Sequence, residues 1–356
     1  MIDELIRGIG PLDKEAMRRA KAHWDNRTHP TGSLGALEAM TIRLAGIQGR
    51  TVPAIDKKAV IVFCADNGVV AEDVSSSPQV FTQMLANAMA RGETGVAAIS
   101  AWAGAELVIL DIGMKEDMER EPNILKRSLR PGTGNIAVEP AMSRDEALRA
   151  VERGANVARD VIAKGATMIG TGELGIGNTT TAAALLCALT GESAEDCVGY
   201  GAGITEDQLA KKVAVVKQAV SRYGEGDVIR KIAQVGGLDL AGLVGVFLAC
   251  AEAKVAVVVD GFVTGAAALA AIELAPAVRD YVFLSHKSAE RASALLNRHL
   301  DLAPPMDLAM RLGEGSGCPL FFQLMEGALY AMKNMGSMED NAIDPGLLVN
   351  IEKESL

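Results

Sequence analysis

The sequence predicts an α/β fold in which a mainly parallel sheet carries helices on both faces. Short, continuous apolar runs rich in β-branched residues recur along the 356 residues, as in strands that are buried on both faces. Helical stretches separate these runs, and alternating strands and helices are typical of a parallel sheet. The predicted strands are residues 59–64, 106–112, 167–170, 254–259 and 281–284.

The predicted helices fill the segments between the strands. Apolar side chains recur at helical spacing from Leu12 to Trp24, and a second helical stretch follows a Pro-Thr-Gly turn. Both ends of the chain are helical in pattern, so we expect residues 1–50 and 319–356 to form a small helical domain. Residues 51–318 then form the large domain. Further helices are predicted over 34–47, 84–103, 144–164 and 179–189.

Composition excludes several classes of protein. The formal net charge is −10 and no long Lys/Arg run is present, so nucleic acid is not an expected partner. The five cysteines lack metal-site or disulfide-framework spacing, which predicts buried reduced thiols, a cytoplasmic protein, and neither metal nor cofactor. Charged residues interrupt the most apolar region, 240–272, into pieces of about a dozen residues, too short to span a membrane.

Each predicted strand ends in small or polar residues. In an open parallel sheet the ligand lies outside the carboxyl ends of the strands. We therefore expect the four loops that follow the strands to converge on one site. These loops begin at Ala65-Asp66, Thr171-Gly172, Asp260-Gly261 and Ser285-His286.

The segment from Gly172 to Ala182 has the pattern of an anion site. Glycines let the backbone approach an anion, and the following helix start offers unpaired N–H groups and a favourable dipole. The alternative interpretation is a tight strand-to-helix turn without a ligand. Lys212 is a plausible phosphate partner, although a lysine is usually a solvated surface charge.

A second glycine-rich segment surrounds one carboxylate. Glu314 stands between Gly313 and Gly315 and has no bulky neighbours, so its side chain can reach into a pocket. A partly desolvated carboxylate has a raised pKa and becomes a usable general base. The alternative is a flexible turn with an exposed glutamate. Ser77, before a predicted helix start, and His286 are weaker candidates that structural roles also explain.

Taken together, these segments resemble the nicotinate-nucleotide–dimethylbenzimidazole phosphoribosyltransferase family. The resemblance covers roughly residues 20–345, and its most specific parts are Gly-Glu-Leu-Gly-x-x-Asn-Thr-Thr and Arg-Leu-Gly-Glu-Gly, in this order. The segments that carry it are 63–69, 91–96, 134–144, 172–184, 235–240, 260–262, 285–290, 310–317 and 334–336.

The resemblance implies a Rossmann-like large domain, a dimer, and transfer of the ribose phosphate of nicotinate mononucleotide to an aromatic base for cobamide synthesis. Glu314 is then the general base that takes a proton from the acceptor. Substrate contacts are implied for Ser77, Leu85 and Leu174 at the acceptor ring, for Gly315 beside the base, and near the ribose phosphate for Glu173, Gly175, Gly177, Asn178, Thr179, Gly203, Lys212 and Ser288.

Two positions depart from the family pattern. Asn67 stands where the family often has histidine, and Leu85 stands where members that use benzimidazoles often carry glutamine. Gln83 lies two residues earlier, so a local shift of the alignment is an alternative. If Leu85 holds the position, the pocket lacks an amide for a ring nitrogen. The chain then resembles the branch that activates phenol or p-cresol as a complex of two homologous subunits.

Two other functions remain open at this point. The chain is alternatively a nucleotide-binding, non-catalytic partner of a homologous transferase, although the intact Glu314 segment speaks against this. A nicotinamide-dinucleotide oxidoreductase needs a G-x-G-x-x-G turn after the first strand, and residues 65–68 do not supply one.

Overall fold

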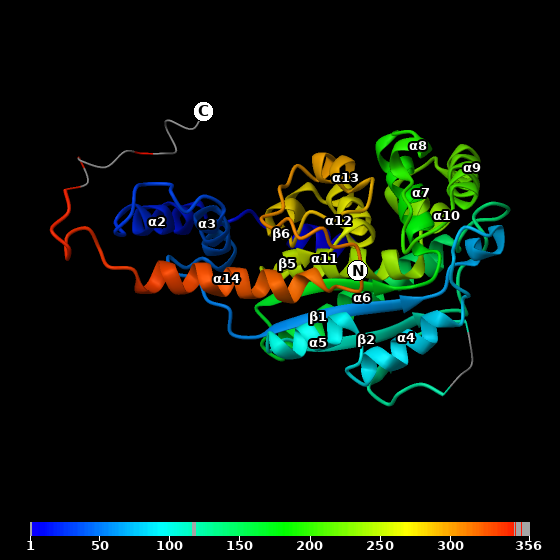
Figure 1. The fold of residues 1–356 in the computed structure, drawn as a ribbon, viewed down its shortest axis with the longest axis horizontal. Helices are drawn as coiled ribbons and strands as arrows, with labels where there is room; N and C mark the ends of the chain where they lie inside the picture. Colours follow the sequence, from blue (N-terminus) through cyan, green and yellow to red (C-terminus); the bar gives the residue numbers. More distant parts are fainter. Residues whose placement is uncertain (1, 116–118, 345, 347–349, 351–356) are drawn as a thin grey trace.

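The computed structural model contains one six-stranded sheet, and it describes residues 2–115, 119–344, 346 and 350. The five pairs of neighbouring strands among the described residues are parallel, and the strand order is β3-β2-β1-β4-β5-β6. This is the order of a Rossmann fold, and the direction of strand progression reverses between β1 and β4. The predicted α/β class is confirmed (Figure 1).

The strands form where the sequence is continuously apolar, but two differ from the prediction. The fourth continues through Gly172, Glu173 and Leu174, which we expected to lie in a loop, because these residues pair with β1. The three-residue edge strand β3 was not predicted, since so short a segment has no readable periodicity. The strands are β1 (Lys58–Ala65), β2 (Glu106–Gly113), β3 (Ile124–Lys126), β4 (Met168–Leu174), β5 (Ala256–Val259) and β6 (Val282–Leu284).

Helices cover both faces of the sheet. One face carries α4 (Phe81–Ala90), α5 (Gly95–Trp102) and the start of α14 (Gly317–Asn334), so the single helix predicted over 84–103 is two helices. They part at Gly92, whose φ of 85° ends the first helix region. The other face carries α6 (Arg144–Ala163), α7 (Asn178–Thr190), α11 (Leu238–Glu252) and α12 (Phe262–Leu274), with α1 (Ile2–Gly8), α8 (Ala194–Cys197), α9 (Glu206–Tyr223), α10 (Val228–Val235) and α13 (Ser293–Leu300) around them.

Glycines bring α6 and α11 into close contact. A Cβ atom on Gly154 would stand 1.8 Å from the carbonyl oxygen of Gly242, so the two backbones touch directly. Every residue of α11 from Leu238 to Ala251 is buried, which makes this helix the centre of the layer above the sheet. The uninterrupted burial explains why the region from 240 onward is so apolar without spanning a membrane. Within the described residues, no helix combines the length and apolar character that a membrane span requires.

The two ends of the chain meet beside the sheet. Helices α2 (Lys14–Asp25) and α3 (Ala36–Gln48) pack together, and α3 packs on α14 (Figure 1). A small separate core forms there from Ala20, Trp24, Ala45 and Met332. However, α14 runs from the sheet into this helical end, and α1 packs on α6 and α11. The division into residues 1–50 with 319–356 and 51–318 stays a prediction, and residues 345, 347–349 and 351–356 lie outside the described ones.

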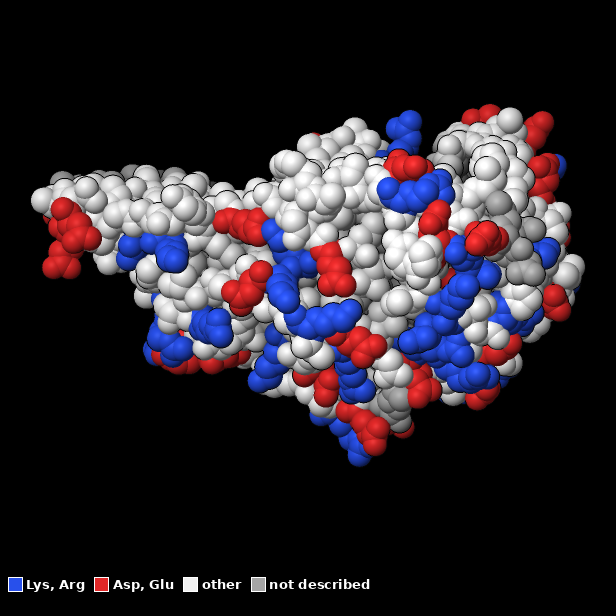
Figure 2. Space-filling view, turned by 90° about the horizontal axis from the view of Figure 1, so that it is seen from below, with Lys and Arg blue, Asp and Glu red and all other residues white. Residues whose placement is uncertain are grey.

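Charges are spread over the surface. Figure 2 shows the side that carries α4 and α5, where Lys and Arg side chains lie close to Asp and Glu. Two large apolar side chains are nevertheless exposed on neighbouring helices: Trp102 on α5 is 68% exposed and Tyr330 on α14 is 70% exposed.

Candidate active site

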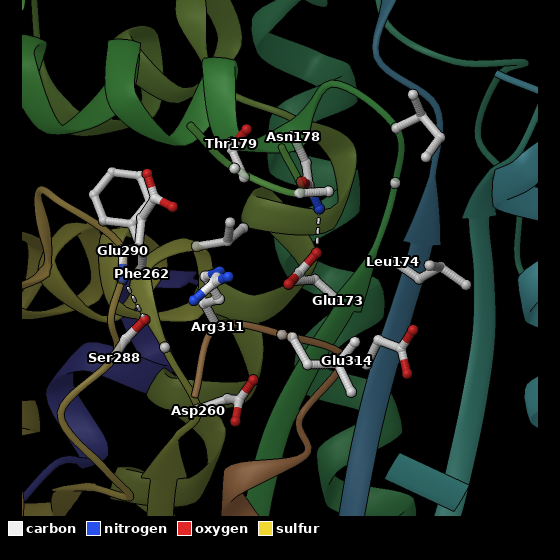
Figure 3. A pocket seen from close by; sticks show the side chains of 18 of the residues that line it. Glu173, Leu174, Asn178, Thr179, Asp260, Phe262, Ser288, Glu290, Arg311 and Glu314 are labelled. Carbon is white, nitrogen blue, oxygen red and sulfur yellow. Dashed lines mark hydrogen bonds between the residues drawn. The ribbon is translucent and has the colours of Figure 1, made fainter. Parts of the chain in front are cut away.

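A pocket of about 240 Å³ opens at the carboxyl edge of the sheet. Three of the four predicted loops line it, those that follow β4, β5 and β6. The first residues after β1, 65–68, do not line it, although Ser77 further along the same connection does. These first residues instead support the pocket from behind, since a Cβ atom on Gly175 would stand 2.1 Å from the oxygen of Ala65. The loop from Arg311 to Glu314 and the start of α4 complete the wall (Figure 3).

The turn between β4 and α7 is built as the sequence predicts. Leu174 ends the strand, Gly177 adopts a φ of 92°, and α7 begins at Asn178. The first turn of this 13-residue helix therefore faces the pocket, with Thr179 in its lining. The amides of Asn178 and Thr180 donate to the carbonyls of Gly175 and Gly177, so the helix dipole and the side chain of Thr179 make this end of the pocket attractive to a phosphate.

Lys212 supports this helix start from behind. Its side chain is 1% exposed, and its Nζ donates hydrogen bonds to Oγ1 of Thr179 at 2.8 Å and to the carbonyl of Gly199 at 3.1 Å. Burial lowers the pKa of Lys212 to about 8. The lysine does not line the pocket and reaches its wall only through the hydrogen bond to Thr179.

Glu173 is a buried carboxylate beside the same helix start. Its Oε2 accepts a short hydrogen bond from Nδ2 of Asn178 (Figure 3). Burial raises the pKa of Glu173 well above its usual range, and the negative charges of Asp239 and Asp260 raise it further. The neighbouring carboxyl groups therefore disfavour the charged form of Glu173, which holds its proton more tightly than an exposed glutamate does.

The Glu314 loop is fixed by a buried aspartate. Asp260 accepts hydrogen bonds from the amides of Gly315 at 3.0 Å and Gly317 at 2.7 Å. Glu314 itself adopts a φ of 63°, which is unusual for a residue with a side chain. A Cβ atom on Gly172 would stand 2.3 Å from the oxygen of Glu314, so this strand glycine lets the loop approach the sheet. Burial raises the pKa of Asp260 to about 7.

The carboxylate of Glu314 keeps one oxygen available. It accepts a hydrogen bond from the backbone of Val96 at the start of α5, while its buried Oε2 finds no hydrogen-bond partner among the described residues. Burial raises the pKa of Glu314 above its usual value. A partly buried carboxylate with an unused acceptor and a raised pKa has the properties of a general base.

Apolar side chains form the wall that faces these carboxylates. Phe81 and Leu85, one turn apart on α4, line the pocket together with Leu174. Gln83 is fully buried and does not line the pocket, so Leu85, and not Gln83, is the residue that faces it. The wall suits a flat aromatic ring.

The structure brings most of the predicted residues together. Three predicted residues lie behind the wall: Lys212 bonds to Thr179, Gly177 forms the turn before α7, and Gly315 holds the Glu314 loop through Asp260. Gly203 is exposed after a turn and does not line the pocket. The predicted residues that line it are Ser77, Leu85, Glu173, Leu174, Gly175, Asn178, Thr179, Ser288 and Glu314.

Sequence reasoning did not select several lining residues, notably Arg311, Asp260, Phe262 and Glu290. Arg311 had a readable signal, since it stands three residues before Glu314 in the same specific segment. Within the described residues, no group of three or more His, Cys, Asp or Glu side chains is arranged to hold a metal ion.

The fold and the pocket are those of a doubly wound α/β protein, with a helix start and the partly buried carboxylate of Glu314 at one pocket. The sequence profile of a phosphoribosyltransferase family matches residues 9–343. The nicotinate-nucleotide–dimethylbenzimidazole phosphoribosyltransferase of Acetivibrio thermocellus is 42% identical over 97% of this chain and 98% of its own. The enzyme of that name from Geobacter metallireducens is 39% identical over 97% and 99%.

A solved structure is similar as well. The crystal structure of CobT from Thermus thermophilus superposes with a TM-score of 0.89 at 38% identity, covering 93% of this chain and 99% of that one. The chain therefore belongs to the nicotinate-nucleotide–dimethylbenzimidazole phosphoribosyltransferase family.

Proposed function

We propose that this protein transfers the 5-phosphoribosyl group of nicotinate mononucleotide to an aromatic base, giving an α-ribotide phosphate for a cobamide and releasing nicotinate. The observation that carries the proposal is the Glu314 carboxylate, which has an unused buried oxygen in a pocket with an apolar wall and an anion-binding helix start. The names of the relatives support the choice of substrates.

The proposed reaction exchanges one bond at the anomeric carbon of the ribose for another. The bond to the nicotinate ring breaks, and its electron pair goes to the ring nitrogen, which neutralises the pyridinium. A lone pair of the acceptor forms the new bond on the opposite face, and the acceptor proton passes to Glu314. Asp260, whose pKa of about 7 leaves it partly ionised at neutral pH, favours the positive charge that develops on the ribose.

The phosphate is proposed to lie at the start of α7. Thr179 and the dipole of this helix start would hold it, and the Lys212 ammonium behind Thr179 favours its charge. Ser288, on the loop after β6, lines the same pocket and is proposed to contact the ribose phosphate.

The acceptor is proposed to include phenols. Leu85 offers no amide to a ring nitrogen, whereas Glu314 offers an acceptor to a phenolic hydroxyl, whose reference pKa is about 10. A ring without nitrogen therefore loses nothing in this pocket. We also propose a cytoplasmic dimer, with itself or a homologous subunit, because Trp102 and Tyr330 leave apolar surface uncovered.

The test is competition between acceptors. The purified chain is incubated with nicotinate mononucleotide and equal amounts of phenol and dimethylbenzimidazole, and the ribotides are separated and identified by mass spectrometry. We expect both products. Exclusive formation of the benzimidazole product contradicts the acceptor proposal, and no ribotide, from the chain alone or with a homologous subunit, contradicts the function.

A further inference from the structure

One positively charged side chain lines an otherwise acidic pocket. Within the described part of the chain, Arg311 is the single lysine or arginine in the lining, which also contains the four carboxylates Glu173, Asp260, Glu290 and Glu314. Burial lowers the pKa of His286, the remaining titratable side chain there, so it is neutral at pH 7. In Figure 3 the guanidinium of Arg311 projects into the space between Glu173 and Ser288.

Arg311 is also unengaged. Among the described residues it has neither a hydrogen bond nor an ion pair, although carboxylates stand on several sides of the same pocket. Two lysines near this edge are engaged instead: Lys211 pairs with Asp73 at 2.6 Å, and Lys287 with Asp307 at 3.0 Å. An unpaired guanidinium in a ligand pocket is suited to a planar anion, which it can bind through two parallel hydrogen bonds.

The proposed substrate carries two anionic groups, and only one of them has a partner so far. The phosphate has the start of α7, Thr179 and Lys212. The carboxylate on the nicotinate ring would meet the carboxylates of the lining, which repel it. We propose that Arg311 binds this ring carboxylate and holds nicotinate as the leaving group. The inference rests on the proposed function and adds to it the residue that selects the acid over the amide.

The charge on the leaving ring changes during the reaction in a way that favours Arg311. Bound to ribose, the ring is a pyridinium with a carboxylate, so its net charge is zero. When the bond to the anomeric carbon breaks, the electron pair neutralises the nitrogen and nicotinate leaves with a charge of −1. In Figure 3 the guanidinium of Arg311 and the carboxylate of Glu314 lie on different sides of Glu173, so Arg311 is placed to meet this growing negative charge away from the proposed base.

The test compares two donors that differ in one group. Nicotinamide mononucleotide has the same ribose phosphate but a neutral carboxamide on its ring. For Arg311→Met we expect kcat/KM with nicotinate mononucleotide to fall roughly 10- to 100-fold, as for a lost charge-assisted hydrogen bond, and with the amide to change less than about threefold. Arg311→Lys should show an intermediate loss of kcat/KM with nicotinate mononucleotide, because lysine keeps the positive charge but cannot form two parallel hydrogen bonds to a carboxylate.

The control removes a positive charge elsewhere. Lys164 follows α6 at the opposite edge of the sheet, and its side chain is 64% exposed, so Lys164→Met should leave both donors unaffected. An equal loss with both donors in Arg311→Met would place the guanidinium on the phosphate and overturn the inference. An unchanged ratio between the donors would overturn it as well.

A binding experiment separates this inference from the proposed function. Calorimetric titration with free nicotinate and with nicotinamide needs no turnover. We expect the wild-type chain to bind nicotinate more tightly than nicotinamide, and Arg311→Met to lose that preference. If the wild-type chain makes no ribotide but shows the Arg311-dependent preference, the reaction is wrong and the carboxylate site stands. No preference in the wild-type chain refutes the site.

Discussion

Replacement of Glu314 by glutamine tests the proposed base with little change of shape. Glutamine keeps an oxygen that can accept the hydrogen bond from Val96, and Asp260 still holds the loop through the amides of Gly315 and Gly317. Only the ability to take a proton is lost. Two other carboxyl groups of the lining are engaged, Glu173 by Asn178 and Asp260 by the amides of the Glu314 loop, so we expect neither to replace the base.

The expected loss follows from the size of general base catalysis. Removing a positioned base typically costs 10²- to 10⁴-fold in rate, or about 3–5 kcal/mol of transition-state stabilisation. We expect a fall of this size in kcat, with KM for nicotinate mononucleotide changed by less than about threefold, because the phosphate end of the pocket is untouched. Ribotide formation is followed by chromatography with phenol as acceptor.

The pH profile gives a second measurement. Because burial raises the pKa of Glu314, the wild-type kcat/KM should rise with pH through a value above the usual glutamate pKa, as the carboxylate forms. Glu314→Gln should lack this acidic limb. The exposed Glu273 on α12 supplies the matched control, Glu273→Gln. A Glu314→Gln enzyme that keeps more than a third of wild-type kcat, or keeps the acidic limb, would refute the assignment.

Stability distinguishes a lost base from a damaged fold. A carboxyl whose pKa is raised on folding binds its proton more tightly in the native state, so the native state loses stability as pH rises through that window. Glu314→Gln is therefore expected to unfold at the same or a higher temperature than wild type at pH 7. A lower unfolding temperature would assign the rate loss to misfolding.

Three further predictions follow from the pocket and the core. Leu85→Gln should raise kcat/KM for dimethylbenzimidazole relative to phenol by roughly tenfold, since the amide meets a ring nitrogen; Met84→Gln, on the exposed side of α4, should not. Because the pKa of Lys212 is about 8, KM for nicotinate mononucleotide should rise above that pH as the ammonium loses its proton. Lys212→Met should have a high KM that does not vary with pH in this range. An unchanged KM in Lys212→Met argues against a role of Lys212 in phosphate binding. In chemical denaturation, Gly154→Ala should destabilise the protein by about 1–3 kcal/mol, because the added Cβ meets the backbone of Gly242. Gly327 lies in α14 with open space around its Cα, so Gly327→Ala should stabilise the protein by about 0.5–1 kcal/mol. Equal effects of the two substitutions would contradict the packing argument.

The strands and the turn before α7 could be predicted from the sequence because neighbouring residues in the chain determine them. Residues 59–64 are apolar on both faces, and such a run is stable only inside a sheet. The glycines before Asn178 allow the tight turn from a strand end to a helix start, and threonines follow in the first turn of the helix. These features depend on neighbours in the chain, so a single sequence carries them.

Contacts between distant segments were not readable. Nothing near Asp260 in the sequence shows that its carboxylate holds the amides of Gly315 and Gly317, more than fifty residues later. For the same reason the extension of β4 through Glu173 was missed, because it depends on pairing with β1. The side of α4 that faces the pocket could not be settled either, since Gln83 and Leu85 both fit a helix start near Phe81.

The helix that begins at the Glu314 loop also ends in the helical extension made by both chain termini. With 18 residues, α14 is about 27 Å long, so a change in its tilt at the helical extension displaces its other end beside the Glu314 loop. A tilt of roughly 2° at Met332 would carry Gly317 by about 1 Å, and a displacement of that size beside a reacting group is known to slow catalysis by orders of magnitude. We therefore expect a partner that binds the helical extension to change the position of Glu314, the proposed base.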